Sequence, residues 1–416
     1  MTLTSTKPTQ PKERIIALDF LRGFALLGIL LMNIQGFSMP DAAYFNPTVY
    51  GDLTGINRWV WILSHIFADS KFMTIFSILY GAGILLVTQK LEGNWRKAAG
   101  LHYRRTFWLL IIGLMHAYLL WTGDILVLYA VTASIVFFFR KLSPTWLIVL
   151  GILTLGIGTL LPLGTQASLP FMPEETKADL IADWDPADEE ITWQTAVYQS
   201  GWLTQMEDRV PSSLDMNTSG LLFWGLWRAG GLMLIGMALY KLGILTAQRS
   251  NAFYRNQLIL GFGLGFPVII YGLVRIFESN FSFEYARFAG SVFNYWGSIG
   301  VSLGYIAIIM LIAKSGRFAR GIRPLAAVGR MALTNYLFHT VVATFIFYGH
   351  GLGLFGQVER IGQLLIVFGI WAAQLILSPI WLRYFKFGPA EWVWRSLTYG
   401  KLQPMKTPSQ QVKIVA

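Results

Sequence analysis

The first apolar stretch of the chain, residues 14–39, limits the folds that the sequence can adopt. Its apolar core is long enough to cross a bilayer as a helix, at about 1.5 Å per residue through about 30 Å of hydrocarbon. Yet it carries Asp19 and Arg22 on one helix face, and Asn33 about three turns later. A membrane helix keeps such groups only where they face protein or water. The sequence therefore predicts that other helices pack around this one.

The overall composition is typical of a membrane protein. Of the 416 residues, 54% are hydrophobic and only 13% are charged, whereas a soluble domain carries about 25% charge. There is no cysteine, which excludes disulfides and thiolate metal ligands. The net charge of +11 does not predict a nucleic-acid partner, because the Lys and Arg excess of a membrane protein normally lies in its cytoplasmic loops. We therefore expect an integral membrane protein in contact with the lipid bilayer and without nucleic acid.

Ten apolar segments have spanning length or come close to it. The second is too long for one span, so we expect residues 56–70 to form an amphipathic lead-in and residues 72–88 to cross. The predicted fold is an all-α, polytopic membrane helix bundle with about ten transmembrane helices. The ten segments are residues 15–37, 56–88, 103–122, 124–140, 145–163, 219–242, 256–276, 290–314, 327–348 and 361–383.

The distribution of Lys and Arg predicts the orientation of the bundle. Basic residues gather between alternate segments, above all in residues 90–105, in the stretch 314–330 and in the tail. The other side holds few of them. This positive-inside pattern predicts that both termini are cytoplasmic. The basic residues on the sparse side are Arg58, Lys177, Arg209, Arg275, Arg287 and Arg360.

The long loop between the fifth and sixth segments divides the chain. It holds half of the 22 acidic residues, and its Trp184, Trp193 and Tyr198 predict that it is partly folded. It is either a solvated extracytoplasmic cap or a lid over an outward-facing site. The predicted parts are a cytoplasmic N-terminal segment (1–14), a first five-helix half (15–163), the acidic extracytoplasmic loop (164–218), a second five-helix half (219–383) and a cytoplasmic amphipathic tail (384–416).

Several polar residues fall at bilayer depth, where they are rare and often functional. His65 and Asp69 are i, i+4 neighbours on the lead-in, and Asn335 and His339 are another such pair in the middle of the ninth segment. Arg228 lies near the middle of the sixth. Depth along the helices predicts that one group could share an outer-leaflet pocket. That group is Asn33, His65, Asp69, Lys71, His116 and Asp124.

Each of these residues also has a structural interpretation. Asp19 and Arg22 form an ion pair in the simplest case, and Asp124 is a candidate helix N-cap. Asn33, Asn335 and Gln374 are candidates for hydrogen bonds between helices. The functional interpretations are a general base at His116, an anion contact at Arg228 and a polar site at His339. No metal site is predicted, because the five histidines show no ligand spacing.

Five stretches of the sequence together resemble the YeiB-like family of bacterial inner-membrane proteins. They are RIIALDFLRGFALLGILLMNIQGF, SKFMTIFSILYGAGI, GLMHAYLLWTGDILVLYAV, VGRMALTNYL and WLRYFKFGPAEWVWR. The resemblance runs from about residue 14 to about residue 398, which is almost the whole chain. It implies a multi-pass protein of the bacterial inner membrane.

A more remote similarity concerns the first helix, whose LDFLRG pattern and following Asn33 are similar to the opening helix of transmembrane acyltransferases. These include heparan-alpha-glucosaminide N-acetyltransferase. Such enzymes take an acyl group from cytoplasmic acyl-CoA and deliver it to an acceptor across the membrane. The matching positions are Asp19, Arg22 and Asn33. The histidine that follows the asparagine in that enzyme by about a dozen residues has no counterpart in FSMPDAAYFNP, so His116 or His65 would have to supply the base.

The sequence leaves three functions open. In a membrane acyltransferase, His116 oriented by Asp124 would be the base, Asn33 would stabilise the oxyanion, and Arg228 would contact a phosphate of the donor acyl-CoA. The acceptor would be a small molecule, a glycan or a lipid, and no metal is needed. In a transporter or channel for a small anionic solute, Arg228, His339 and the Asp19–Arg22 pair would line the path. The third function is a membrane scaffold. Each is compatible with a homo-oligomer.

Overall fold

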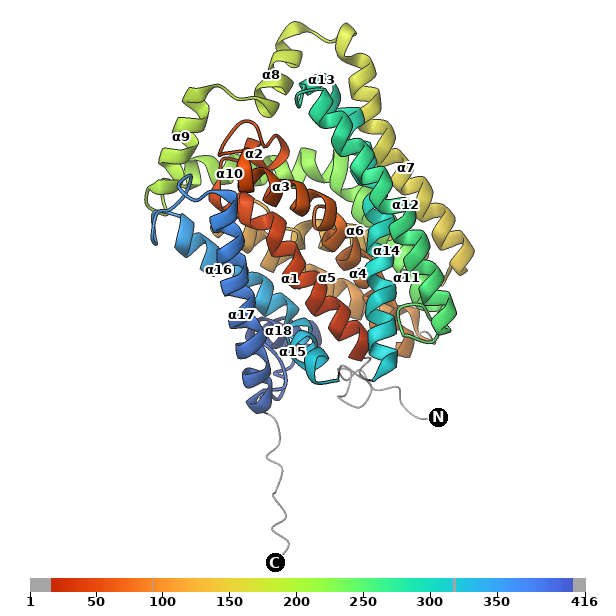
Figure 1. Cartoon of the computed structure of the whole chain (residues 1–416). Coiled ribbons are helices and arrows are strands. Elements are labelled where there is room, and N and C mark those ends of the chain that lie inside the picture. The colour runs from red at the N-terminus through yellow and green to blue at the C-terminus, as the bar shows by residue number, and fades with distance from the viewer. Residues whose placement is uncertain (1–15, 92, 317–318, 407–416) are drawn as a thin grey trace, which may run out of the picture.

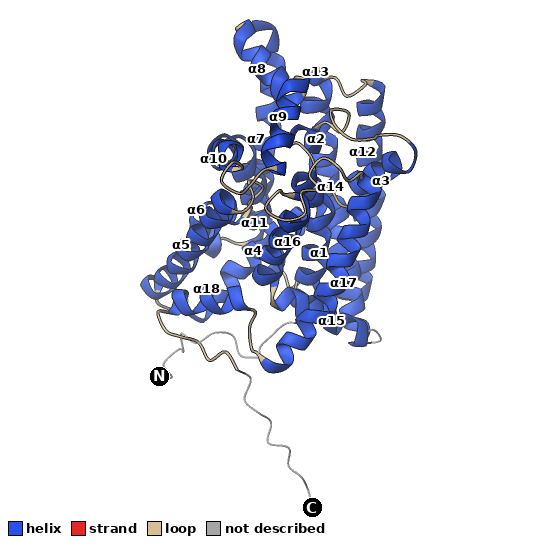
Figure 2. Ribbon diagram, turned by 90° about the vertical axis from the view of Figure 1, so that its left-hand side faces the viewer, coloured by secondary structure: helices blue, strands red, loops and turns tan. Residues whose placement is uncertain are grey.

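The computed structural model is a bundle of helices with a small helical cap at one end (Figure 1). It describes residues 16–91, 93–316 and 319–406. No strand occurs in this part of the chain, as Figure 2 shows. Seven helical stretches within it are long and apolar enough to cross a membrane, and Ala332–Phe347 is a shorter apolar helix. The prediction of an all-α, polytopic membrane bundle is confirmed, and the count of ten crossings stays a prediction.

The helices of the first half follow the predicted segments closely. A break separates α3 from α4, as expected from the excess length of the second segment. Ser70 stands at this break in the left-handed conformation, with φ at 63°. The first half therefore contains α1 (Ile16–Ser38), α2 (Ala42–Phe45), α3 (Gly55–Phe67), α4 (Lys71–Thr88), α5 (Trp95–Leu119), α6 (Leu126–Val136) and α7 (Pro144–Ser168).

The acidic loop is folded, as its aromatic residues predict. It contains α8 (Glu174–Trp184), α9 (Asp188–Gln199) and α10 (Met206–Asp215), which together with their connections we call the cap (residues 169–215). The buried Trp184 indole donates to the carbonyl of Phe281 at 3.0 Å, and the Tyr198 ring packs on Phe355. The neighbouring helices extend into the predicted loop at both ends, because α7 continues to Ser168 and α10 leads through a π-helical stretch (Met216–Gly225) into α11.

The second half contains one break that the sequence did not predict. The predicted ninth segment is divided at Met331, where α15 ends and α16 begins. Of the basic stretch 314–330, Arg317 lies outside the described residues. The helices are α11 (Leu226–Lys241), α12 (Asn251–Glu278), α13 (Phe283–Tyr285), α14 (Ser291–Ser315), α15 (Ala319–Arg330), α16 (Ala332–Phe347), α17 (Arg360–Tyr384) and α18 (Pro389–Tyr399).

Helix α1 lies in the interior of the bundle and is packed against α4, α14, α15, α16 and α17 (Figure 1). Its approach to α15 is close enough to require glycine. A Cβ on Gly23 would stand 1.9 Å from the Leu325 carbonyl oxygen, and a Cβ on Gly329 would stand 1.9 Å from that of Asp19. The prediction that other helices surround this segment is therefore confirmed.

The bundle has two distinct ends (Figure 2). The cap lies at one of them, which we call the cap end. Helices α15 and α18 and the start of α1 lie at the other, which we call the basic end. The predicted N-terminal segment 1–14 and the last residues of the predicted tail fall outside the described residues. The described part of the tail contains the amphipathic helix α18.

Candidate functional site

His116 is held between a carboxylate and a hydroxyl in the interior of the bundle. It lies in the last turn of α5, and its Nδ1 is 2.8 Å from an Asp124 carboxylate oxygen. Its Nε2 is 2.8 Å from the hydroxyl of Thr340 on α16. All three residues are buried. The structure thus confirms the pairing of His116 with Asp124 and adds Thr340 as a third member.

Asp124 has two roles that the sequence analysis treated as alternatives. One carboxylate oxygen accepts from the His116 ring, and the other accepts from the backbone N–H of Val127 at 2.8 Å, in the first turn of α6. The residue is therefore a helix cap and a histidine partner at once. Because the cap fixes the carboxylate, the imidazole that it binds is also fixed.

The hydrogen bonds define the tautomer of a neutral His116. A carboxylate only accepts, so Nδ1 carries the proton and donates to Asp124. Nε2 then has a free electron pair, which accepts from the Thr340 hydroxyl. A hydroxyl, an imidazole and a carboxylate in this order are the arrangement in which a histidine activates a hydroxyl group. The Tyr336 ring lies beside the imidazole, with ring centroids 5.1 Å apart.

Asn33 lies on the side of α1 that faces Trp121. One helical turn further along, the Gly36 carbonyl accepts from the Trp121 indole at 3.1 Å, and the Trp121 ring contacts His116 with centroids 6.4 Å apart. Residues three apart share a helix face. The half-buried Asn33 side chain has no hydrogen bond to another described residue. Its amide is therefore uncommitted, one helical turn from the contact of α1 with Trp121.

A second polar group connects α3, α4 and α14. The His65 ring and the Asn294 amide both contact the Asp69 carboxylate, at 3.2 and 2.7 Å. The Lys71 ammonium donates to the Asn294 side-chain oxygen at 2.7 Å and to the His65 carbonyl at 2.6 Å. Lys71 is fully buried, and the His65 side chain is 13% exposed. His65 is thus a second histidine that a carboxylate orients.

Arg228 of α11 lies beside this second group and has only neutral partners. Its guanidinium donates to the hydroxyls of Thr74 and Ser298 at 2.8 and 2.7 Å and to the Tyr295 carbonyl. No ion pair joins Arg228 or Lys71 to a carboxylate in the part of the chain that the structure covers. Two buried cations therefore share the neighbourhood of one carboxylate, Asp69, and an anion there would improve the balance of charge.

The hydrogen bonds arrange five of the six residues expected in one outer pocket as two groups, and Asn33 joins neither group. His65, Asp69 and Lys71 belong to one group, and His116 and Asp124 belong to the other. No hydrogen bond between described residues connects the two groups. Asp19 and Arg22 pair with each other at 2.8 Å near the basic end of α1, so their predicted ion pair is confirmed.

Asn335 and His339 form a third group, with α17. The Gln374 side-chain amide donates to the backbone carbonyl of Asn335 at 2.9 Å. This hydrogen bond turns the side-chain oxygen of Gln374 towards His339 Nε2, at a distance of 2.8 Å. His339 therefore donates through Nε2. Its buried Nδ1 has no partner within the described residues. The Asn335 amide donates to the Ser378 hydroxyl at 3.0 Å, which confirms the predicted hydrogen bonding between helices.

Sequence reasoning singled out Gln374 of the third group but missed the hydroxyl and amide partners in the first two groups. Thr340 and Asn294 are more than 220 residues away from the side chains that they bind. Single Thr, Ser and Asn residues are common in membrane helices and have no spacing that would mark them. Regarding metals, no group of three or more His, Cys, Asp or Glu in the described ranges is placed to hold an ion.

Comparisons with known proteins identify relatives along the full length of the chain. Residues 239–401 match a family described as "Protein of unknown function (DUF418)". The "Uncharacterized protein YeiB" of Escherichia coli is 32% identical over 400 residues, which cover 94% of this chain and 98% of the relative. The "Uncharacterized protein YxaH" of Bacillus subtilis is 30% identical, with 97% and 98% covered. An "Uncharacterized 39.9 kDa protein in amylase 3'region" of Bacillus acidopullulyticus is 27% identical over 413 residues. The chain therefore belongs to the YeiB-like family.

Proposed function

We propose that the protein is a membrane acyltransferase that moves an acyl group from cytoplasmic acyl-CoA to a hydroxyl-bearing acceptor at the cap end, in the bacterial inner membrane. The observation that supports this most strongly is the buried relay of Thr340, His116 and Asp124, with distances of 2.8 Å on both sides of the imidazole. A relay of this kind is built to accept a proton from a hydroxyl. It also fits the similarity of α1 to acyltransferase opening helices.

In the proposed reaction, the acceptor oxygen attacks the thioester carbonyl of the acyl-CoA. The acceptor gives its proton through the Thr340 hydroxyl to His116 Nε2, and Asp124 stabilises the imidazolium. The Asn33 amide donates to the developing oxyanion. When the C–S bond breaks, the proton passes from His116 to the CoA sulfur, so the products are an acyl ester and free CoA. Arg228 is proposed to hold a phosphate of the donor.

The test measures transfer of labelled acetyl groups from acetyl-CoA to the lipid and glycan fractions of membrane vesicles that contain the full chain. We expect His116→Gln to reduce transfer by 10²-fold or more, in the range of about 10²–10⁴ for removal of a general base. The same substitution at His102 is the matched control. His102 lies on the same helix and is also buried, and its ring contacts the Ala133 carbonyl at 3.1 Å and the rings of Tyr103 and Phe137.

Two results would contradict the proposal. One is a wild-type chain that neither binds acetyl-CoA nor transfers the label. The other is equal loss of transfer in His116→Gln and His102→Gln, which would indicate a general effect of losing a buried imidazole. Circular dichroism and gel filtration of both variants show whether the bundle is intact.

The second candidate function is transport of a small anion, and the group around Lys71 and Arg228 favours it. Two buried cations beside a single carboxylate are an arrangement that an anion would stabilise. This function predicts that sealed vesicles take up a labelled small anion without CoA, and that Arg228→Gln abolishes uptake. Uptake that persists in the variant would contradict the role of Arg228.

A further inference from the structure

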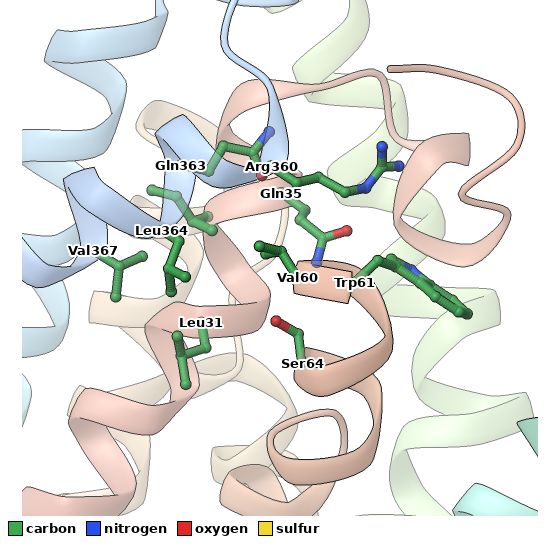
Figure 3. Close-up of a pocket in the computed structure, with 10 residues that line it drawn as sticks. Leu31, Gln35, Val60, Trp61, Ser64, Arg360, Gln363, Leu364 and Val367 are labelled. Atoms are coloured by element: carbon green, nitrogen blue, oxygen red, sulfur yellow. The ribbon is translucent and has the colours of Figure 1, made fainter. Parts of the chain in front are cut away.

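A small cavity lies between α1, α3 and α17, towards the cap end (Figure 3). Its walls include Leu31 and Gln35 of α1, Trp61 and Ser64 of α3, and Arg360 at the start of α17. The space that a water-sized group can occupy is about 10 Å³, about the room that one water or one hydroxyl needs. The cavity is separate from the three polar groups described above.

Two buried polar atoms of the residues that line it have no partner within the described chain. They are the side-chain oxygen of Gln35 and the Nε of Arg360, and both residues are more than nine-tenths buried. The two terminal nitrogens of Arg360 donate to the carbonyls of Asp52, Pro47 and Tyr50 at 2.9 to 3.1 Å. The guanidinium is therefore fixed, and its Nε–H cannot turn away to find another acceptor.

These two atoms specify the chemistry of a ligand. Arg360 Nε only donates, and the Gln35 oxygen only accepts. A group that satisfies both must accept one hydrogen bond and donate another. A hydroxyl does this with one atom, whereas a carboxylate cannot donate to Gln35 and an ammonium cannot accept from Arg360. Figure 3 shows the Gln35 amide and the Arg360 side chain next to each other in the cavity wall.

The surroundings of the cavity indicate that its occupant comes from the membrane. Leu31, Val60 and Leu364 line it and are themselves partly exposed. Next to them along the helices, Leu63 of α3 and Leu365 and Phe368 of α17 are exposed. Large exposed apolar side chains on membrane-spanning helices face lipid. The partly exposed wall of the cavity is therefore bordered by a lipid-facing surface on both sides.

We propose that this cavity binds a hydroxyl group in the headgroup of a membrane lipid, such as the glycerol of phosphatidylglycerol. The headgroup hydroxyl accepts from Arg360 Nε and donates to the Gln35 oxygen, and the acyl chains follow the apolar surface of α3 and α17. The position of Gln35 near the end of α1 and of Arg360 at the start of α17 matches the depth of headgroups in the leaflet at the cap end. This binding site does not depend on the acyltransferase activity.

The experiment compares two lipids of equal charge and identical acyl chains. Phosphatidylglycerol carries headgroup hydroxyls, and phosphatidylethanol carries none. Both are titrated into the delipidated, full-length chain in detergent, and binding is followed by native mass spectrometry. We expect the wild type to bind phosphatidylglycerol about tenfold more tightly, because only its headgroup hydroxyl can form hydrogen bonds with both Arg360 Nε and the Gln35 oxygen. In Gln35→Met the preference should fall to about threefold, because only the hydrogen bond from Arg360 Nε remains.

Gln363→Met is the matched control, because Gln363 lines the same cavity but its amide already donates to the Val358 carbonyl at 3.0 Å. This variant should lose thermal stability and keep the preference for phosphatidylglycerol. Gln35→Met should keep its thermal stability, since its oxygen has no protein partner to lose. Equal binding of both lipids to the wild type would overturn the proposal and leave a water site. Free glycerol that binds as well as the lipid would overturn the assignment to a lipid.

Discussion

At the scale of single residues, Thr340 is the most informative position in the proposed relay. Its hydroxyl donates to His116 Nε2 and is fully buried. We predict that Thr340→Val, which keeps the shape of the side chain, lowers acetyl transfer at least tenfold because the proton path to the imidazole is broken. Thr340→Ser keeps the hydroxyl and should retain transfer within a few-fold. The labelled acetyl-CoA assay measures both.

The pH profile of Thr340→Ser separates a proton path from a packing role. A variant that still passes the proton through the same histidine should keep the wild-type profile, since the group that titrates is unchanged. If Thr340→Val and Thr340→Ser are equally active, the hydroxyl takes no part in the reaction and Thr340 only fills space beside His116.

At the scale of elements, the position of α16 depends on α18. The buried Glu391 carboxylate accepts from the backbone N–H groups of Leu333 and Thr334 at 2.6 and 3.1 Å, at the start of α16. We predict that Glu391→Ala lowers the free energy of unfolding by about 1–3 kcal/mol, because two buried donors lose their acceptor. Glu391→Gln keeps an acceptor oxygen and should cost less. Thermal melts in detergent measure the difference.

The contact between Glu391 and α16 also makes the stability of the fold depend on pH, in a direction that can be predicted. Burial raises the pKa of the Glu391 carboxyl above its ordinary value of 4.5, against the opposing effect of its hydrogen bonds. The fold therefore favours the protonated form, and the stability of the wild type should fall relative to Glu391→Gln as the pH rises from 4.5 through the raised pKa. A stability difference that is independent of pH, or one of opposite sign, would contradict this account.

The sequence was enough to predict where the helices begin and end in most places. It was not enough to predict which side chains from distant helices contact each other within the polar groups. Length and amphipathic pattern predicted the division of residues 56–88 into α3 and α4, because both act within one segment. The break at Met331 was missed because the predicted segment 327–348 joined the last residues of α15 to α16. The pairing of His116 with Asp124 was predicted because a tight turn joins them. Thr340 was missed because only the fold brings α16 to α5.

At the scale of the whole molecule, the cap is tied to the bundle through a small acidic contact. The side-chain oxygen of Gln194 on α9 accepts from the backbone N–H of Asp41 at 3.0 Å, and its amide donates to the Asp208 carboxylate of α10. Burial and the negative charge of Asp208 raise the pKa of the Asp41 carboxyl to about 7. Asp41 therefore changes its charge near neutral pH, at the junction between the cap and α1.

A raised pKa in the folded state means that this junction is most stable when Asp41 is protonated, and that its stability is lost as the pH rises through about 7. We predict that hydrogen exchange in α9 and α10, corrected for its intrinsic rate, speeds up between about pH 6 and pH 8. Asp41→Asn should remove this dependence, because its side chain stays neutral.

Asp52→Asn is the control, since hydrogen bonds from Thr54 and Asn57 lower the pKa of exposed Asp52. Its exchange profile should match the wild type. If Asp41→Asn keeps the wild-type dependence, another group controls the attachment of the cap.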